Sequence, residues 1–310
     1  MREPLEFPGV VRVRGHASGL GYTRPMKRVL VTGASGNVGR EVVRALLARG
    51  AAVRAAGSEL SLRRMFGSEV QAVPLDFRDP RTFEAAVVGC SELFLLRPPA
   101  ISNTAQTLNP FIDVARARGV GHVVFLSVAG AGQNKIVPHH AVEVHLALRG
   151  ADWTVLRPGF FAQNLEAAYL QDIREDDRLY VPAGRARVAF VDVRDVAEVA
   201  ASALLEPSVH VGRAYTLTGA EALTFEAVAE LLSNAIGRSI RYVPATALGY
   251  LWHLHRRGLP VAQALVQTLL HVGLRFGQAE DIDPTLESLL DRTPRTMRDY
   301  LYDLRATWVH

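Results

Sequence analysis

Hydrophobic residues in the first half of the chain form short, near-continuous runs separated by segments with helical spacing. Continuous runs, rather than alternating ones, are typical of parallel strands that are covered on both faces. We expect strands over residues 28–33, 52–56, 70–73, 92–96, 122–127 and 153–158. A first helix face is traced by Val38, Val42, Val43, Leu46 and Leu47, and a longer helix is expected over 102–118, ended by Gly119. The alternation predicts an α/β fold, a Rossmann-type doubly wound parallel sheet with helices on both faces.

The alternation becomes irregular after residue 158. The elements expected there are a strand running into a helix over 188–207, strands over 214–219 and 240–244, and helices over 224–237 and 245–308. Thr224 is the expected N-cap of its helix, and Thr293, followed by Pro294, is the expected start of the last one. The pattern predicts a dinucleotide-binding domain over 26–158 and a smaller α/β substrate region over 159–310, packed on the sheet end and intertwined with the same domain.

Residues 1–25 fit neither pattern. They lack the continuous apolar core of a signal peptide, and Met26 directly precedes the first predicted strand. No apolar run approaches the roughly 18 residues that a membrane span requires. We therefore expect a disordered extension outside the fold, no membrane partner and a cytoplasmic location.

The segment VLVTGASGNVG (residues 29–39) places three glycines at three-residue intervals between the first strand and the first helix. Such a turn lets backbone amides approach a pyrophosphate, while the positive end of the helix dipole faces it. A Cβ on any of these glycines would obstruct that approach or the packing of helix on strand. Because a strand precedes the motif and an amphipathic helix follows it, we predict a dinucleotide site rather than a structural turn. The residues expected to form it are Gly33, Ser35, Gly36, Asn37, Val38 and Gly39.

This glycine spacing resembles that of the extended and atypical short-chain dehydrogenase/reductase superfamily. The likeness continues in PLDFRDP, FLLRPP, HVVFLSVAGA and WTVLRPGFFAQNL. Together with FVDVRDVAEVAASALLEP, AYTLTGAEALTFEAVAELL and RTPRTMRDYL, it makes residues 27–303 similar to the NmrA-like branch. The resemblance implies further cofactor contacts from Asp76, Phe77, Leu96, Arg97, Pro98, Ser127, Pro158, Gly159 and Phe160.

The end of the second predicted strand usually decides which dinucleotide is bound. No Asp or Glu stands at this strand end to bind a ribose diol, which disfavours strict use of NAD. Ser58 stands where many NmrA-like proteins carry an arginine, and its hydroxyl is able to donate to a 2′-phosphate. Arg63 or Arg64 would supply the charge, with a solvated helix face as their alternative role. We expect NADP(H) to be preferred over NAD(H).

The Tyr-x-x-x-Lys pair with which most short-chain reductases protonate a carbonyl is absent. Lys27 and Lys135 are the only lysines, and no tyrosine stands four residues before either. The superfamily's tyrosine position falls at His139, four residues before Glu143. Ser127 is a candidate to polarise a substrate oxygen, or a strand cap. His139 is a candidate proton donor, or a surface or helix-start residue.

Other residue types narrow the picture. His139, His140 and His145 are close in sequence, but only Glu143 lies near them as a further ligand, so no metal site is predicted. The single cysteine, Cys90, excludes an internal disulfide and a cysteine-based zinc cluster. The net charge of +4 comes from scattered arginines without a basic run, which argues against a nucleic-acid partner.

The substrate side carries fewer signals. The resemblance implies that Phe161 and Asn164 follow the nicotinamide-facing segment toward the substrate. Trp252, on one helix with Tyr250 and His253, is a candidate to sandwich a flat substrate. For the phenylalanines and Trp252 the alternative is packing. Two further acids, Asp192 and Asp195, are expected to cap the helix that follows them.

We therefore expect an NAD(P)H-dependent oxidoreductase of the NmrA-like type, which passes hydride directly to a quinone-like or other conjugated small molecule. Such an acceptor needs no strong protein acid, because its reduced form takes a proton from water. The alternative is a non-catalytic NAD(P)-sensing regulator, and a third hypothesis is an isomerase or biosynthetic tailoring enzyme. The expected assembly is a monomer or homodimer.

Overall fold

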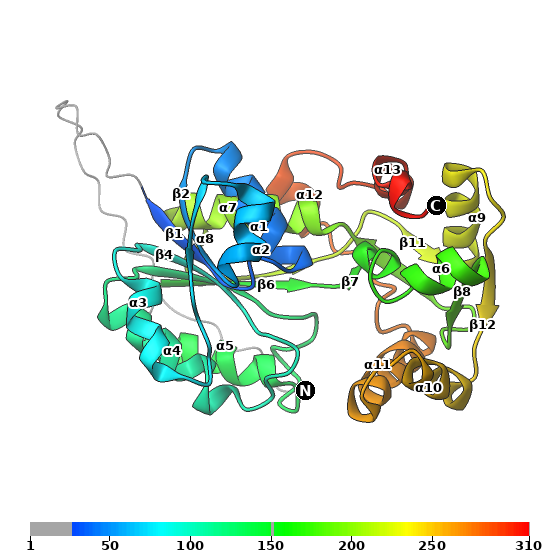
Figure 1. Ribbon diagram of the computed structural model, residues 1–310, viewed down its shortest axis with the longest axis horizontal. Helices are drawn as coiled ribbons and strands as arrows, with labels where there is room; N and C mark the ends of the chain where they lie inside the picture. Colours follow the sequence, from blue (N-terminus) through cyan, green and yellow to red (C-terminus); the bar gives the residue numbers. More distant parts are fainter. Residues whose placement is uncertain (1–26, 150–151, 310) are drawn as a thin grey trace, which may run out of the picture.

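The computed structural model describes residues 27–149 and 152–309, so the extension expected over 1–25 lies outside the described residues. Seven parallel strands form the main sheet, in the order β10-β6-β5-β4-β1-β2-β3 (Figure 1). They are β1 (Arg28–Val31), β2 (Ala52–Ala56), β3 (Val70–Val73), β4 (Glu92–Leu96), β5 (His122–Leu126), β6 (Asp152–Pro158) and β10 (Arg213–Leu217). The predicted doubly wound sheet is confirmed. It gains β10, which comes from the second half of the chain and pairs with β6.

Helices cover both faces of the main sheet (Figure 1). One layer contains α1 (Asn37–Ala48), α2 (Glu59–Phe66), α7 (Val193–Leu205) and α12 (Thr285–Leu290), and the other contains α3 (Phe83–Val87), α4 (Leu108–Ala117) and α5 (Pro138–Leu148). The short α8 (Pro207–His210) follows α7. Strand β5 is buried along its whole length, as expected of a strand covered twice.

The single helix expected over 102–118 is divided. A 3-10 turn, η2 (Thr104–Gln106), comes first, and the backbone of Thr107 leaves helical geometry before α4 begins. Pro110 then lies in the first turn of α4, where a proline displaces no helical hydrogen bond. Four further 3-10 turns are described, namely η1 (Pro80–Thr82), η3 (Ala162–Leu165), η4 (Leu274–Phe276) and η5 (Arg305–Thr307).

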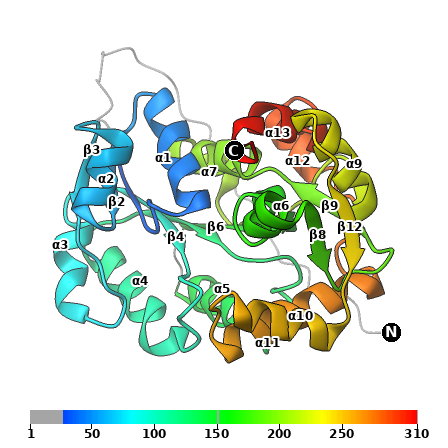
Figure 2. The same ribbon diagram turned by 45° about the vertical axis from the view of Figure 1, so that its right-hand side comes forward.

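A second part, which we call the C-terminal lobe, comprises residues 159–191, 218–283 and 293–309 and has its own hydrophobic core. Its sheets have the orders β11-β9-β7 and β12-β8. The strands are β7 (Phe160–Phe161), β8 (Arg178–Val181), β9 (Arg187–Val191), β11 (Ala222–Thr224) and β12 (Arg241–Pro244). The helices are α6 (Leu170–Asp176), α9 (Phe225–Ile236), α10 (Ala247–Arg256), α11 (Val261–Gly273) and α13 (Met297–Asp303) (Figure 2).

Helix caps in this half were partly predictable. The hydroxyl of Thr224 accepts a hydrogen bond from the amide of Ala227, and Asp192 caps α7, as expected. Asp195 does not cap that helix, because its carboxylate accepts from Arg292 and Arg295. The last helix was expected to open at Thr293, and this is wrong. Its N-cap is Thr296, which forms a capping box with Asp299.

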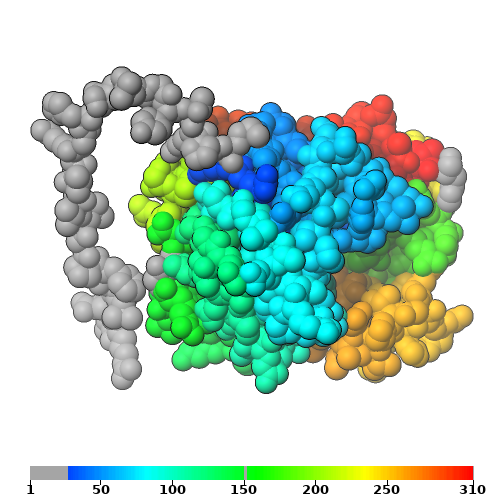
Figure 3. Space-filling model, turned by 60° about the vertical axis from the view of Figure 1, so that its left-hand side comes forward, coloured from blue at the N-terminus to red at the C-terminus, as the bar shows by residue number. Residues whose placement is uncertain are grey.

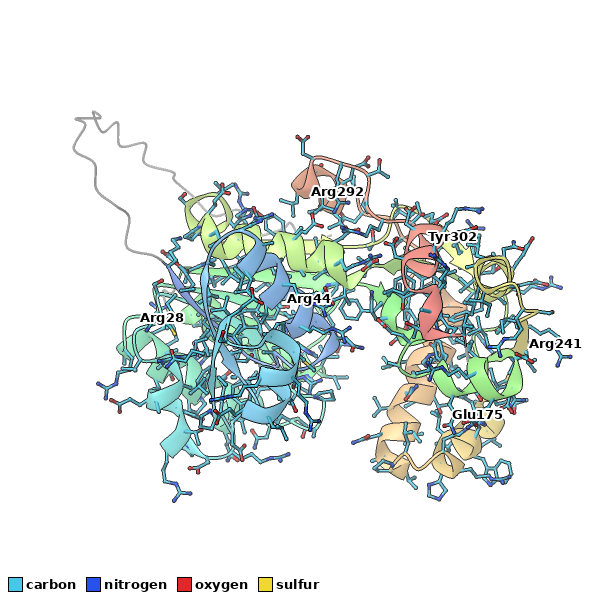
Figure 4. The ribbon with its side chains drawn as sticks, turned by 45° about the horizontal axis from the view of Figure 1, so that its top comes forward. Arg28, Arg44, Glu175, Arg241, Arg292 and Tyr302 are labelled. Atoms are coloured by element: carbon cyan, nitrogen blue, oxygen red, sulfur yellow. The ribbon has the colours of Figure 1, made fainter. Side chains whose placement is uncertain are left out.

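The chain passes repeatedly between the two parts. After β9 it returns to the main sheet as α7, α8 and β10, and after η4 it returns again as α12. Strand β6 leads directly into β7, so the lobe lies beyond the carboxyl ends of the main strands (Figure 1). Figure 4 shows Arg28 near one end of the molecule and Arg241 at the other. In Figure 3 a hollow separates the orange segment, which holds α10 and α11, from the cyan part of the surface. Within the described ranges, we find no helix with the length and apolar character needed to span a bilayer.

Candidate functional site

The glycine loop joins β1 to α1 at the carboxyl edge of the main sheet. Gly33 has a φ of +63°, a left-handed conformation that favours glycine. A Cβ on Gly39 would lie 2.2 Å from the carbonyl oxygen of Gly33, so only a glycine lets the first turn of α1 pack on the loop. These two glycines therefore fix the shape of the turn.

Gly36 has a different role, because it is the N-cap of α1 and has an extended backbone. A Cβ there would meet only the oxygen of Gly33, at 3.3 Å, and would otherwise project into open space. No side chain caps this helix, and its first turn holds no acidic residue. The first amides of α1 have no partner within the helix, so they form a cradle with positive potential. Ser35, Gly36 and Asn37 are exposed, whereas Val38 and Gly39 are buried and contribute backbone only. The cradle fits a pyrophosphate.

The three residues expected to bind a 2′-phosphate, at and after the end of β2, differ in their contacts. Ser58 is exposed at the N-cap position of α2, and its side chain makes no capping bond. Arg64 is also exposed. Arg63 instead pairs with Glu59 at 2.7 Å and lines a pocket of about 530 Å³. That pocket extends from Glu59, next to Ser58, to the start of β3. Arg64, unlike Arg63, has no carboxylate partner in the part of the chain that the structure describes.

The segment after β3 was expected to contact the cofactor through Asp76 and Phe77. Asp76 is exposed, and its carboxylate accepts from the amide of Arg78 at 2.9 Å. Phe77 is only 5% exposed and packs edge-on against Phe111 with 5.2 Å between ring centroids. The ring of Phe77 is thus part of the core under α4, and only Asp76 faces the surface.

At the end of β5, Ser127 and Arg157 both bind the carboxylate of Glu143. The hydroxyl of Ser127 donates to Oε1 of Glu143 on α5. Arg157 of β6 donates to the same carboxylate through Nε at 3.1 Å and Nη2 at 2.6 Å. Ser127 is 2% exposed and Glu143 8% exposed. This buried network leaves the Ser127 hydroxyl proton committed to Glu143, so the structure does not support Ser127 as a group that polarises a substrate oxygen.

His139 lies one turn earlier on α5 and is 9% exposed. Its Nε2 accepts a hydrogen bond from Nε of Arg97, 3.2 Å away at the end of β4. Burial, followed by the nearby Arg97 charge, lowers the pKa of His139 to about 4. The imidazole is therefore neutral near pH 7, and the structure does not support its expected role as proton donor.

The other histidines of α5 have separate partners. Nδ1 of His140 lies 2.9 Å from the carbonyl oxygen of Ala131, and Nε2 of His145 lies 2.9 Å from Asp113. Lys27, at the start of β1, binds Glu92 at the amino edge of the sheet, away from the glycine loop. Lys135 is exposed in the loop before α5.

The candidates after β6 divide between the surface and the core. Pro158 is buried, whereas Gly159, Phe160, Phe161 and Asn164 are partly exposed. The ring of Phe160 contacts those of Phe190, Phe225 and His271 in the lobe. Phe161 packs instead against the core shared by α1 and α7. The RPGFF segment thus joins the two parts at the carboxyl edge, next to the half-buried Leu96, Arg97 and Pro98 of the loop after β4.

Trp252 and His253 line one surface pocket, whereas Tyr250 on the same helix is buried. Tyr250 is 1% exposed, and His253 binds Asp172 at 2.9 Å. Trp252 is 61% exposed, and the guanidinium of Arg256 stacks on its ring. It lines a shallow surface pocket of about 660 Å³ together with residues of α6 and β8. This placement separates Trp252 from the glycine loop.

Glu143 and Arg157 were not among the predicted site residues. Two signals in the sequence were available. Glu143 stands four residues after His139 on one helix, so the two share a face. Arg157 interrupts the apolar run WTVLRP, where a charge requires a buried partner.

The model of the NmrA-like family matches residues 25–301. An NAD(P)H azoreductase from Xenophilus azovorans is 32% identical over 282 residues, which is 88% of this chain and 96% of that protein. The chain belongs to the NmrA-like family. An agroclavine dehydrogenase from Claviceps fusiformis is also 32% identical, over 71% of this chain and 76% of its own length.

Two solved NmrA-like folds are close in shape. One is the NADPH-dependent quinone oxidoreductase QOR2 from Escherichia coli complexed with NADPH, with a TM-score of 0.78 and 24% identity, over 89% of this chain and 99% of that one. The other is the triphenylmethane reductase of Citrobacter sp. complexed with NADP(H), with a TM-score of 0.78 and 22% identity over the same shares. At these identities the likeness concerns the fold of this NmrA-like protein.

Proposed function

We propose that this NmrA-like protein is an NADPH-preferring reductase that passes hydride to a quinone-like or other conjugated small molecule. The observation that carries the proposal is the exposed glycine cradle, whose backbone donors have no side-chain cap. Membership of a family whose relatives are named azoreductase and quinone oxidoreductase supports the reaction type. We also propose that the protein acts as a monomer or homodimer, in the cytoplasm and without a nucleic-acid partner.

The cofactor would lie along the carboxyl edge of the main sheet. Backbone amides from Asn37 to Gly39 would hold the pyrophosphate, since the amide of Gly36 donates to the carbonyl oxygen of Gly33. Ser58 and Arg64 would bind the 2′-phosphate, and the exposed Asp76 would contact the adenine end. Gly33 keeps the loop flat under Leu96, whose side chain would lie 3.1 Å from a Cβ at that position.

At the other end, Gly159 and Phe160 would lie beside the nicotinamide, with Phe161 and Asn164 toward the acceptor. Bound NADPH supplies a hydride, which carries two electrons, and the acceptor gains one further proton. Ser127 and His139 are buried and bound to neighbours, so neither offers that proton. Water would supply it, because reduction of a conjugated acceptor leaves a weakly basic, delocalised anion.

The test is NADPH oxidation, followed at 340 nm, with a panel of quinones, cationic dyes and simple ketones. We expect turnover of quinones or dyes, no turnover of simple ketones, and a lower KM for NADPH than for NADH. Failure of every acceptor to accelerate NADPH loss would contradict the reductase assignment.

A non-catalytic sensor of NAD(P) is the second candidate. It is favoured by the internal hydrogen bonds of the two candidate catalytic residues. Ser127 donates to Glu143, and His139 accepts from Arg97, so both side chains have a structural role. Tight and redox-selective cofactor binding without turnover, together with a co-purifying protein, would favour the sensor over the reductase.

A further inference from the structure

Arg97 is the first residue after β4, and its guanidinium is held in a fixed position. Nε donates to His139, and Nη1 donates to the carbonyl oxygens of Pro98, Pro99 and Ile101. Nη2 has no hydrogen-bond partner within the ranges that the structure describes, and it is not enclosed by other atoms. Two N–H donors of a preorganised guanidinium therefore remain available at the carboxyl edge of the sheet.

The charge of Arg97 is not balanced by a carboxylate. Arg157 and Arg194 bind one directly, in Glu143 and Asp192, and the buried Arg54 has hydrogen bonds from all three of its nitrogens to Gln71 and backbone carbonyl oxygens. Arg97 forms no ion pair with any residue in 27–149 or 152–309, and burial lowers its pKa. A half-buried cation without an acid is unfavourable, so a ligand anion at this place would be stabilised.

Arg97 and the glycine loop lie on opposite faces of the main sheet, which argues against the pyrophosphate as that anion. The neighbouring Leu96 packs against the core shared by α1 and α7, on the face of the glycine loop. Arg97 points to the opposite face, because successive side chains of a strand alternate. There it meets His139, whose ring lies 6.1 Å from Phe125 under α5. On that face Arg97 would border the acceptor side of the proposed nicotinamide position.

We propose that Arg97 is a specificity residue that binds an anionic substituent, a sulfonate or carboxylate, on an aromatic acceptor. This inference rests on the proposed function, since the anion would belong to the molecule that is reduced. Both free donors are on Nη2, so such a group would accept charge-assisted hydrogen bonds from that one nitrogen, whose position the other contacts of the guanidinium fix. The hydride step is unchanged, and the anion adds binding energy remote from the reacting atoms.

The first test compares 1,2-naphthoquinone with 1,2-naphthoquinone-4-sulfonate at saturating NADPH. The two quinones differ in intrinsic reactivity, but this difference is the same for every enzyme variant. A change in the ratio of their kcat/KM values between variants therefore reports on the protein alone. We expect Arg97→Gln to lower kcat/KM for the sulfonated quinone by about tenfold more than it lowers kcat/KM for the neutral quinone, so that loss of the loop contacts, which both quinones share, cancels in the ratio. The wild-type preference should decrease as ionic strength rises.

The matched control is Arg78→Gln. Arg78 is exposed and donates to the carbonyl oxygen of Ala100 in the same loop, so this variant removes a neighbouring charge and loop contact. We expect it to change both quinones less than about twofold, because an exposed charge is screened. Arg97→Lys keeps the charge without the fixed, planar guanidinium and should retain part of the sulfonate preference.

Two kinetic outcomes would overturn the proposal. A rise in the KM for NADPH that is equal with both quinones would assign Arg97 to the cofactor. An equal loss of kcat/KM for both quinones in Arg97→Gln and in Arg97→Lys would mean that Arg97 only holds the loop.

Calorimetry on NADP⁺-loaded protein with 2-naphthalenesulfonate and the uncharged 2-naphthalenemethanol tests Arg97 without turnover. If neither quinone is reduced, the reductase proposal fails, and calorimetry then decides on the anion site alone. Tighter binding of the sulfonate than of the alcohol, lost in Arg97→Gln, would support the anion site. Equal binding of the two by the wild-type protein would refute it.

Discussion

The glycine loop and the strand ends beneath α5 lie at the same edge of the same sheet, and they treat polar groups in opposite ways. At the loop, backbone amides point outward from an uncapped helix start. Beneath α5, Ser127 and Arg157 both bind Glu143, and His139 binds Arg97. The comparison shows that polar groups without partners inside the protein remain available to a ligand, whereas those already bound to one another do not. The polar residues beneath α5 hold that helix against the sheet.

The largest expected effect is at the loop. Gly36→Val would place a branched side chain in the cradle, while its Cβ meets only the Gly33 oxygen at 3.3 Å. We expect NADPH binding to weaken by more than about 100-fold, or roughly 3 kcal/mol, with a near-native fold. Calorimetry would measure NADPH binding, and circular dichroism would check the fold. Gly121→Val, where the nearest atom to an added Cβ is 3.8 Å away at the amino edge, is the control. Tight binding by a folded Gly36→Val variant would refute the cradle.

The network beneath α5 should respond in stability instead. Glu143→Leu leaves the Arg157 charge and the Ser127 hydroxyl without their partner, so we expect a loss of about 3 kcal/mol in the free energy of unfolding. Urea denaturation would measure it. In the double variant Glu143→Leu/Arg157→Met both charges are gone, and part of that loss should be recovered. Additive losses in this double-mutant cycle would mean that the pair is not coupled.

Acid should weaken the same region through His139. Its pKa is about 4 in the folded protein against an ordinary value of 6.5, so between these values the unfolded chain binds a proton that the folded protein does not. Stability contributed by His139 is therefore present above pH 6.5 and is lost as pH falls toward 4. His139→Gln keeps an acceptor for Arg97 and should remove on the order of 2–3 kcal/mol of this pH dependence. Parallel wild-type and variant curves of unfolding free energy against pH would contradict the assignment.

The smallest effects separate the two arginines of α2. Arg64→Gln should raise the KM for NADPH by about fivefold and leave that for NADH unchanged, since an exposed charge adds roughly 1 kcal/mol to phosphate binding. Arg63→Gln should change neither by more than about twofold, because Arg63 pairs with Glu59. Steady-state kinetics with both cofactors would check this. Equal effects of the two substitutions would remove the distinction.

The sequence predicted those features that depend on local spacing. The strands of the first half, the turn at Gly33 to Gly39, and the caps at Thr224 and Asp192 follow from neighbours within one turn of chain. The start of the last helix was missed because Thr293 and Thr296 are equivalent cap residues in sequence. Only Thr296 has an acid, Asp299, at the position that closes a capping box.

The site beneath α5 depends on contacts across strands, which spacing does not reveal. Ser127 and Glu143 are 16 residues apart, and Arg97 and His139 are 42 residues apart. Their positions were found, but their roles follow from burial and partner choice. The same holds for two aromatic residues that were expected to contact ligands. Phe77 is buried under α4, and Trp252 lies on the surface.

The return of the chain from the C-terminal lobe as α7 and β10 has a consequence for engineering. Residues 27–158 include the whole glycine loop but lack the strand that protects the outer edge of β6 and the helix that covers α1. An excised fragment would expose an open strand edge and an apolar face, which favours aggregation. The lobe therefore cannot be exchanged as a cassette between relatives, and chimeras that alter acceptor choice should graft individual loops while keeping residues 193–217 with their own sheet.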